Sequence, residues 1–206
     1  MLFDILALIS VVCVIPLISR ITDLCPRLLA GLTRWKEHVN LQTSLKTRTD
    51  RDLAALALIL PFCLTAFRFR LYTPEFMAGM KPDAGLAVTI GVFLTFLLLR
   101  FLTYHIFRSH KIPSATYGSA AGAANSFFII LCLLLMLTGG LLTLFDVPSE
   151  GIRVAMFWLS GTTYALFLLR KAQIFLSSCN FLMSFLYLCA LEILPTGVLI
   201  ASAVVF

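Results

Sequence analysis

The chain has 206 residues, of which 60% are apolar and only 13% are charged, and its net charge at neutral pH is +6. A soluble domain of this size is nearer 45–50% apolar, with about 25% of its residues charged. This composition therefore excludes an ordinary soluble domain and predicts a protein of the lipid bilayer. Six cysteines stand singly without a repeated spacing, which argues against a disulfide framework or a zinc site and predicts small buried apolar side chains.

Six apolar stretches come close to the roughly 20 residues that a membrane-spanning helix needs. They are residues 2–18, 53–67, 85–107, 118–145, 154–169 and 174–206. The second stretch is the weakest because it is the shortest, and the last is too long for one upright helix. We expect a kink or break at Pro195, because proline disrupts a helix interior. The predicted fold is all-α: residues 1–206 form a single polytopic transmembrane helical bundle of about six spans.

The lysines and arginines of this six-span arrangement fall mainly on one side, twelve against four. Because cytoplasmic loops carry the excess of these residues, both termini are expected to face the periplasm or exterior. Residues 20–52 then form a long, basic cytoplasmic loop. No aromatic-interleaved basic platform accompanies the positive charge, so no nucleic-acid partner is expected.

Within that loop, residues 21–37 place their apolar side chains on one side of a helix, which is expected to begin at Pro26. Two interpretations remain open. The helix lies on the anionic inner leaflet, with lipid contact through residues 20–37, or it docks a partner protein. Residues 40–52 are polar and are expected to be exposed and mobile.

Glu192 is the foremost candidate for a functional residue, because apolar residues flank it on both sides. An ionised carboxylate in hydrocarbon costs at least a few kcal/mol unless it is paired or protonated, so it must face protein or water. On one long helix, a polar stripe would form from Gln173, Ser177, Asn180, Ser184 and Glu192. One interpretation is a proton or cation pathway; the other is a carboxyl that bonds a neighbouring helix or caps backbone groups near Pro195.

Arg100 is the second intramembrane candidate. Its side chain either snorkels to the cytoplasmic headgroups or pairs with a buried acceptor such as Asn125 or Glu192. The small residues from Gly118 to Gly122 have a GxxxG spacing, for which helix packing within the chain is favoured over homodimerisation.

No chemistry-bearing motif accompanies these residues. His105 and His110 are five apart and do not share a helical face, so no metal site is expected. Nucleotide-binding loops, zinc-protease motifs and nucleophile elbows are absent from the sequence. Neither catalytic residues nor cofactors are therefore expected.

The C-terminal region has an unusual string, which begins with Arg170-Lys171 and closes with Leu-Tyr-Leu-Cys-Ala-Leu-Glu-Ile-Leu-Pro at residues 186–195. This motif resembles that of an uncharacterised family of polytopic inner-membrane proteins from Bacteroidota, known as a domain of unknown function. The resemblance is close over residues 170–195 and loose elsewhere. It implies a bacterial inner-membrane location and marks Cys189, Glu192 and Pro195 as family-defining, with Asn125 a weaker match, but it implies no activity.

The expected function is that of a non-enzymatic accessory or scaffold subunit of a larger inner-membrane assembly. Protein export and envelope biogenesis are the candidate processes, and other inner-membrane proteins are the expected partners. The alternative is a small proton- or cation-coupled channel or carrier that uses Glu192. No internal repeat is evident in the sequence, which weakens the carrier interpretation.

Overall fold

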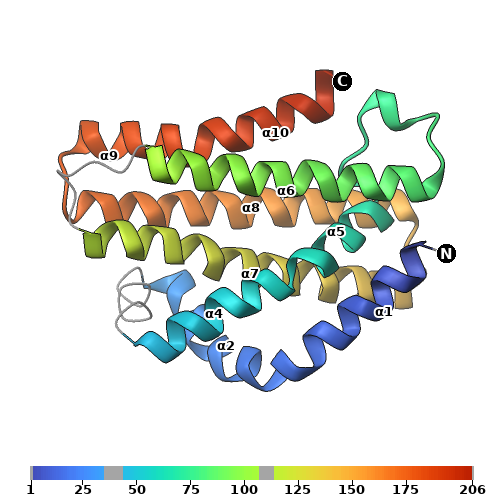
Figure 1. Cartoon of the computed structure of the whole chain (residues 1–206), viewed down its shortest axis with the longest axis horizontal. Helices are drawn as coiled ribbons and strands as arrows, with labels where there is room; N and C mark the ends of the chain where they lie inside the picture. Colours follow the sequence, from blue (N-terminus) through green and yellow to red (C-terminus); the bar gives the residue numbers. More distant parts are fainter. Residues whose placement is uncertain (1, 35–43, 107–113, 206) are drawn as a thin grey trace.

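The computed structural model describes residues 2–34, 44–106 and 114–205, and all of the secondary structure in these ranges is helical (Figure 1). The all-α prediction is confirmed. The α-helices are α1 (Leu2–Val14), α2 (Ile18–Thr33), α4 (Leu45–Ala57), α5 (Ile59–Arg68), α6 (Pro82–Ile106), α7 (Ser114–Leu144), α8 (Ser149–Leu176), α9 (Phe181–Leu188) and α10 (Leu194–Val205). Short 3-10 turns lie at Ile15–Leu17 and Glu75–Met77, and a π turn lies at Cys189–Ile193.

Five stretches of the described chain are long and apolar enough to cross a membrane, so the chain is a multi-pass membrane protein. They are Leu2–Leu32, Pro82–Ile106, Thr116–Leu144, Ser149–Leu176 and Phe181–Ala203. The expected span at residues 53–67 is not among them. It is divided at Leu58 into α4, which opens with a polar run, and α5, and these two helices follow one another along the bundle (Figure 1).

The bundle has two ends, which the connections between helices define (Figure 1). At the α2–α4 end, α2, α6 and α8 finish and α4, α7 and α9 begin. At the α5–α6 end, α5 and α7 finish and α6 and α8 begin. The chain starts at the α5–α6 end, and α10 runs back toward it.

Helix α2 differs from the expected surface helix. It begins at Ile18, and Pro26 lies inside it instead of at its start. Its apolar side is buried in the core of the chain itself, against residues of α4 and α7, which makes one cluster of Leu17, Ile21, Leu24, Leu28, Ala54, Ala55, Leu58, Ile129, Ile130 and Cys132. The amphipathic pattern is therefore satisfied inside the protein, because α4 and α7 supply the apolar surface that it needs. Residues 35–37 lie outside the described residues.

The polar stretch after this helix is ordered where the structure describes it. Residues 45–52 form the first turns of α4, and the Ser44 side chain caps that helix by accepting a hydrogen bond from the Thr47 backbone N–H. Arg51 is only 2% exposed. The expected mobile stretch is therefore a helix over residues 45–52. The prediction of exposure is confirmed for residues 44–46, 48 and 49 and is wrong for Arg51, and residues 40–43 lie outside the described residues.

The C-terminal apolar stretch is divided twice. Helix α8 continues to Leu176 and α9 begins at Phe181, so Gln173 and Ser177 do not share a helix with Glu192 and the expected polar stripe is wrong. The predicted break near Pro195 is confirmed as the π turn, in which the Leu194 N–H bonds the Cys189 carbonyl. Proline lacks an N–H and its ring crowds the carbonyl four residues earlier, so the wider turn relieves both problems.

The α5–α6 end is closed by apolar packing. Helices α5 and α7 are each followed, two residues after their last residue, by a left-handed residue, Arg70 (φ 51°) and Asp146 (φ 52°). The next N–H groups, of Leu71 and Val147, then bond carbonyls five residues back, at 2.9 and 3.1 Å. Both side chains pack in a cluster around Leu135, Ile152 and Met156. This end of the bundle is held by hydrophobic contacts.

All six cysteines are free thiols. Cys63 and Cys132 are buried as expected, and the Cys132 thiol bonds the Leu58 carbonyl at the break between α4 and α5, at 3.7 Å. Cys13, in contrast, is exposed on α1, so the expectation of burial is wrong for this residue.

Candidate functional site

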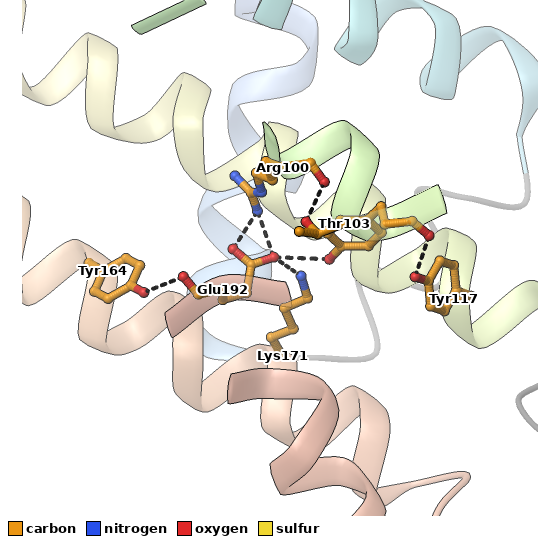
Figure 2. A network of polar contacts seen from close by, with 7 residues as sticks. Arg100, Thr103, Tyr117, Tyr164, Lys171 and Glu192 are labelled. Atoms are coloured by element: carbon orange, nitrogen blue, oxygen red, sulfur yellow. Dashed lines mark hydrogen bonds and ion pairs between the residues drawn. The ribbon is translucent and has the colours of Figure 1, made fainter. Parts of the chain in front are cut away.

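Glu192 lies in the π turn and is 2% exposed. Its carboxylate accepts hydrogen bonds from three side chains (Figure 2). The Arg100 Nη2 atom lies 2.8 Å from Oε1 and 2.7 Å from Oε2, and the Tyr104 hydroxyl lies 3.0 Å from Oε1. The third donor is the ammonium group of Lys171, which also bonds Oε1. We call these four residues the Glu192 cluster; they join α6, α8 and the C-terminal span.

Backbone groups around the cluster are bonded as well (Figure 2). The Tyr117 hydroxyl, from α7, donates to the Tyr104 carbonyl at 2.7 Å, and the Thr103 hydroxyl donates to the Arg100 carbonyl at 2.8 Å. The Tyr164 hydroxyl, from α8, donates to the carbonyl of Glu192 at 3.3 Å. Helix α7 is thereby attached to the cluster as a fourth element. These backbone hydrogen bonds hold the side chains that donate to Glu192 in fixed positions.

Two cations share one carboxylate in this cluster. Lys171 is fully buried, and its Nζ atom lies 4.4 Å from the centre of the Tyr104 ring and 5.3 Å from that of Phe167. The Arg100 guanidinium lies 5.6 Å from the Phe167 ring. Aromatic faces attract cations, so they offset part of the cost of removing two positive charges from water. The cluster nevertheless has one positive charge in excess.

The cluster lies toward the α2–α4 end of the bundle. Arg100 is six residues before the end of α6, and Lys171 is five residues before the end of α8. At 1.5 Å per residue, both lie within about 10 Å of the ends of their helices. Arg100 and Lys171 therefore lie nearer to this end of their helices than to the other, whereas Glu192 lies midway along the candidate span Phe181–Ala203.

Sequence reasoning found part of this cluster. Of the alternatives for Arg100, the structure has the pair with Glu192, so snorkelling does not describe this side chain. The twelve cations predicted for one side of the membrane include Lys171, which is completely buried in the structure. The signal that could have found it is the lone carboxylate, because a charge in hydrocarbon requires a counter-charge. Without Arg51, Arg100 and Lys171, the predicted loop cations still number nine against four.

Asn125 joins a different group, which we call the Asp52 cluster. Its amide donates to Asp52 Oδ1 at 2.9 Å, and the guanidinium of Arg51 donates to the same oxygen at 3.0 and 2.9 Å. Arg48 lies 3.9 Å from the other oxygen. This cluster, made of Arg48, Arg51, Asp52 and Asn125, joins α4 to α7.

The glycine spacing in α7 serves the same contact. The buried guanidinium of Arg51 rests directly on Gly122, where a Cβ atom would overlap it. Gly122 therefore packs within the chain, as predicted for the GxxxG spacing.

The other predicted candidates lie outside both clusters. Asn180 stands at the start of α9, and its carbonyl accepts a 3.1 Å hydrogen bond from the buried Ser184 hydroxyl. Cys189 begins the π turn, and Pro195 follows it as the second residue of α10. These residues shape the backbone that positions Glu192.

A groove of about 420 Å³ runs between α6 and α10. Its lining includes Gly91, Thr95 and Leu99 of α6 together with Pro195 of α10. Tyr72 and Ser202 also line it, and their hydroxyls lie 3.0 Å apart. None of the four residues of the Glu192 cluster is among the lining residues, so the groove does not open onto the carboxylate.

The part of the chain that the structure describes contains no group of three His, Cys, Asp or Glu side chains able to hold a metal ion. His105 is exposed and stacks on Phe101, with ring centres 6.4 Å apart. His110, which was predicted not to share a helical face with His105, lies outside the described residues.

In comparisons with known proteins, no family model matched the chain, and no similar protein was found among curated sequences or solved structures. The resemblance of residues 170–195 to a Bacteroidota family therefore stays a prediction. Chemically, the geometry of the Glu192 cluster is that of a fixed ionic contact between spans, because every donor is already directed at the carboxylate.

Proposed function

We propose that this chain is a non-enzymatic scaffold or accessory subunit of a larger assembly in the bacterial inner membrane. The observation that carries the proposal is the engagement of Glu192 by three donors from two other spans while its side chain is 2% exposed. Such a carboxylate holds its neighbours in one arrangement, because any movement of α6 or α8 leaves a buried charge without its partner. A rigid bundle of this kind suits a subunit around which other membrane proteins assemble.

The outer surface of α8 supports the presence of a partner. Gly161, Thr162 and Ala165 are exposed on it, and a Cβ atom added at Gly161 would meet nothing within 4 Å. Small residues on a membrane helix allow another helix to approach closely. We therefore expect the partners to be other inner-membrane proteins, with protein export and envelope biogenesis as the candidate processes.

Affinity purification in a mild detergent tests the proposal. The wild-type chain should retain a partner in fixed stoichiometry, and Gly161→Leu should release it because the larger side chain blocks close helix approach. Gly140→Leu is the matched control, because Gly140 is an exposed glycine with open space on α7. A chain that purifies alone as a monodisperse species would contradict the proposal.

We also propose that both termini face the periplasm. The positions of the chain ends in the bundle support an even number of crossings (Figure 1). The excess of loop cations supports a cytoplasmic α2–α4 end. Reporter fusions after Phe206 and within residues 40–50 test this orientation, and a cytoplasmic reporter after Phe206 would contradict it.

A second candidate function is a small proton- or cation-coupled carrier, in which Glu192 loads the ion. The observation that favours it is the π turn at Glu192, next to two further ionisable groups inside the spans, because π turns and intramembrane charges are frequent at functional sites. Proton flux into liposomes containing the purified chain separates the two functions. Flux that Glu192→Gln abolishes, with the amount of folded protein unchanged, would favour the carrier.

A further inference from the structure

The cations of three helices gather at the α2–α4 end of the bundle. Arg27 of α2 reaches α4, where its Nη1 atom lies 3.3 Å from the Thr47 hydroxyl. Arg170 of α8 reaches α2, where its Nε atom donates to the Leu32 carbonyl at 2.8 Å. We define the basic face as the cations that these contacts bring together at this end, which are Arg20, Arg27, Arg34, Lys46, Arg48 and Arg170.

These side chains project outward from the bundle. The first five are exposed, and Arg170 is half-buried. The apolar side of α2 is occupied by the core, so its basic side is what remains for a partner. This surface therefore differs from the lipid contact expected at residues 20–37. It includes cations of α4 and α8, and the apolar side of α2 does not insert into the lipid because it is packed in the core.

The acids nearby do not balance this face. The charged residues of α2 and α4, together with Arg34 and Arg170, are seven cations and three acids. The cations are the basic face and Arg51, and the acids are Asp23, Asp50 and Asp52, so the net charge is +4. Asp50 pairs with Arg20 at 2.9 Å, and Asp52 is engaged by Arg48, Arg51 and Asn125. Two of the six cations of the basic face, Arg20 and Arg48, are thus in ion pairs with these acids. Most of the face is therefore available to an external anion.

The opposite end of the bundle has the reverse balance. Among the residues that the structure describes, this end has four cations, which are Arg68, Arg70, Lys81 and Arg153. Five acids accompany them, namely Asp4, Glu75, Asp83, Asp146 and Glu150, for a net charge of −1. The two ends of one membrane protein thus present opposite charge to the two surfaces of the bilayer.

We infer that the basic face binds the headgroups of anionic phospholipids in the leaflet at the α2–α4 end. The position of the face supports this occupant, because the candidate spans that include α2, α6, α7, α8 and α9 all have one end here. Charge complementarity supports it as well, because each lysine or arginine near an anionic surface gains roughly fivefold in affinity. This inference is independent of the proposed scaffold function.

The test measures which lipids stay with the purified full-length chain. The protein is placed in nanodiscs made from equal amounts of phosphatidylglycerol and phosphatidylcholine, and the lipids that it retains are counted by native mass spectrometry. We expect the wild type to retain phosphatidylglycerol in preference. The preference should fall as salt rises from about 0.05 to about 0.5 M, because the screening length then shortens several-fold.

Two variants with equal loss of charge make the test specific. The basic-face variant combines Arg27→Gln, Lys46→Gln and Arg48→Gln, and the control combines Arg68→Gln, Lys81→Gln and Arg153→Gln at the other end. The phosphatidylglycerol preference should fall at least about tenfold in the first variant and stay unchanged in the control. Circular dichroism and gel filtration verify that both are folded. A variant that misfolds is replaced by the corresponding single substitutions, for which the expected fall in preference is about fivefold each at the basic face and none at the other end. Equal retention of both lipids by the wild type, or equal loss in both variants, would overturn the inference.

Discussion

The Glu192 and Asp52 clusters have the same chemical composition and different surroundings. Each contains one carboxylate, two cations and one uncharged donor. The Glu192 side chain is 2% exposed, however, whereas that of Asp52 is 41% exposed. Water and ions therefore screen the Asp52 carboxylate and Arg48, although Arg51 is buried, while the Glu192 cluster depends on its own geometry. Burial, more than the number of ion pairs, decides how strongly each cluster constrains the fold.

The clusters also connect different parts of the chain. Arg48, Arg51 and Asp52 are near neighbours on α4, and only Asn125 comes from elsewhere. The donors to Glu192 come from α6 and α8, and two of them lie 92 and 88 residues away in the sequence. The loss of Glu192 should therefore loosen the bundle, whereas the loss of Asp52 should loosen one contact between α4 and α7.

The largest expected effect belongs to Glu192→Leu. It leaves the buried Lys171 and the partly buried Arg100 without their carboxylate, so we expect the free energy of unfolding to fall by about 3–5 kcal/mol. Glu192→Gln should also be strongly destabilising, because a neutral amide cannot balance two positive charges. Steric trapping in bicelles measures both values. A loss below about 1 kcal/mol in the leucine variant would show that the buried cluster is no more important than an exposed one.

Tyr104→Phe should have the next largest effect. It removes one hydrogen bond to the carboxylate and keeps the ring beneath Lys171, so we expect a loss of about 1.5–2 kcal/mol. The same measurement applies. In a Glu192→Leu background the substitution should cost much less, because its partner is already gone, and an undiminished cost there would contradict the proposed hydrogen bond.

Lys171→Met should be milder, although Lys171 is the more deeply buried cation. The substitution removes the excess charge and leaves Arg100 and Glu192 as a one-to-one pair, so the free energy of unfolding should change by about 1 kcal/mol or less. Arg100→Met is the companion variant, because it leaves the same charge balance with the lysine as the remaining cation. If Lys171→Met destabilised the protein as much as Glu192→Leu, the cluster would not carry one positive charge in excess, and this interpretation would be wrong.

The smallest expected effect is that of Asp52→Asn. The Asp52 carboxylate is half-exposed and Arg48 is hydrated, and an amide oxygen at this position still accepts from the buried Arg51. We therefore expect a loss of about 0.5 kcal/mol that decreases further at high salt. The Glu192 variants should show little salt dependence under the same conditions. A salt-independent loss at Asp52 would mean that this cluster is shielded from water in the membrane.

Much of the fold could be predicted from composition and the lengths of apolar stretches. The helices at residues 82–106, 114–144 and 149–176 overlap the three predicted central spans almost completely, because length and hydropathy directly express the thickness of the membrane. The amphipathic pattern of α2 was also visible. Which surface its apolar side would face could not be predicted, because periodicity does not distinguish lipid, a partner and the chain's own α7.

The site was less predictable for a related reason. The pair of Arg100 and Glu192 depends on their relative depth, which is set by where α9 begins and by the π turn. Lys171 follows a long apolar run, so it has the pattern of a residue at the end of a span. Asn125 and Asp52 are 73 residues apart, and no local pattern connects them.

The π turn also sets the angular relation between the two helices that it joins. It accommodates about one more residue in its turn than an α-helix would, and each residue of an α-helix contributes 100° of rotation. If the same residues were wound as a regular α-helix, α9 would be turned by about 100° relative to α10, whereas deleting Ala190 would remove the extra residue and leave the two helices close to their present relation. The extra residue thus gives each helix its own phase, so that Glu192 points at α6 and α8 from an angle that an uninterrupted helix of this sequence would not provide.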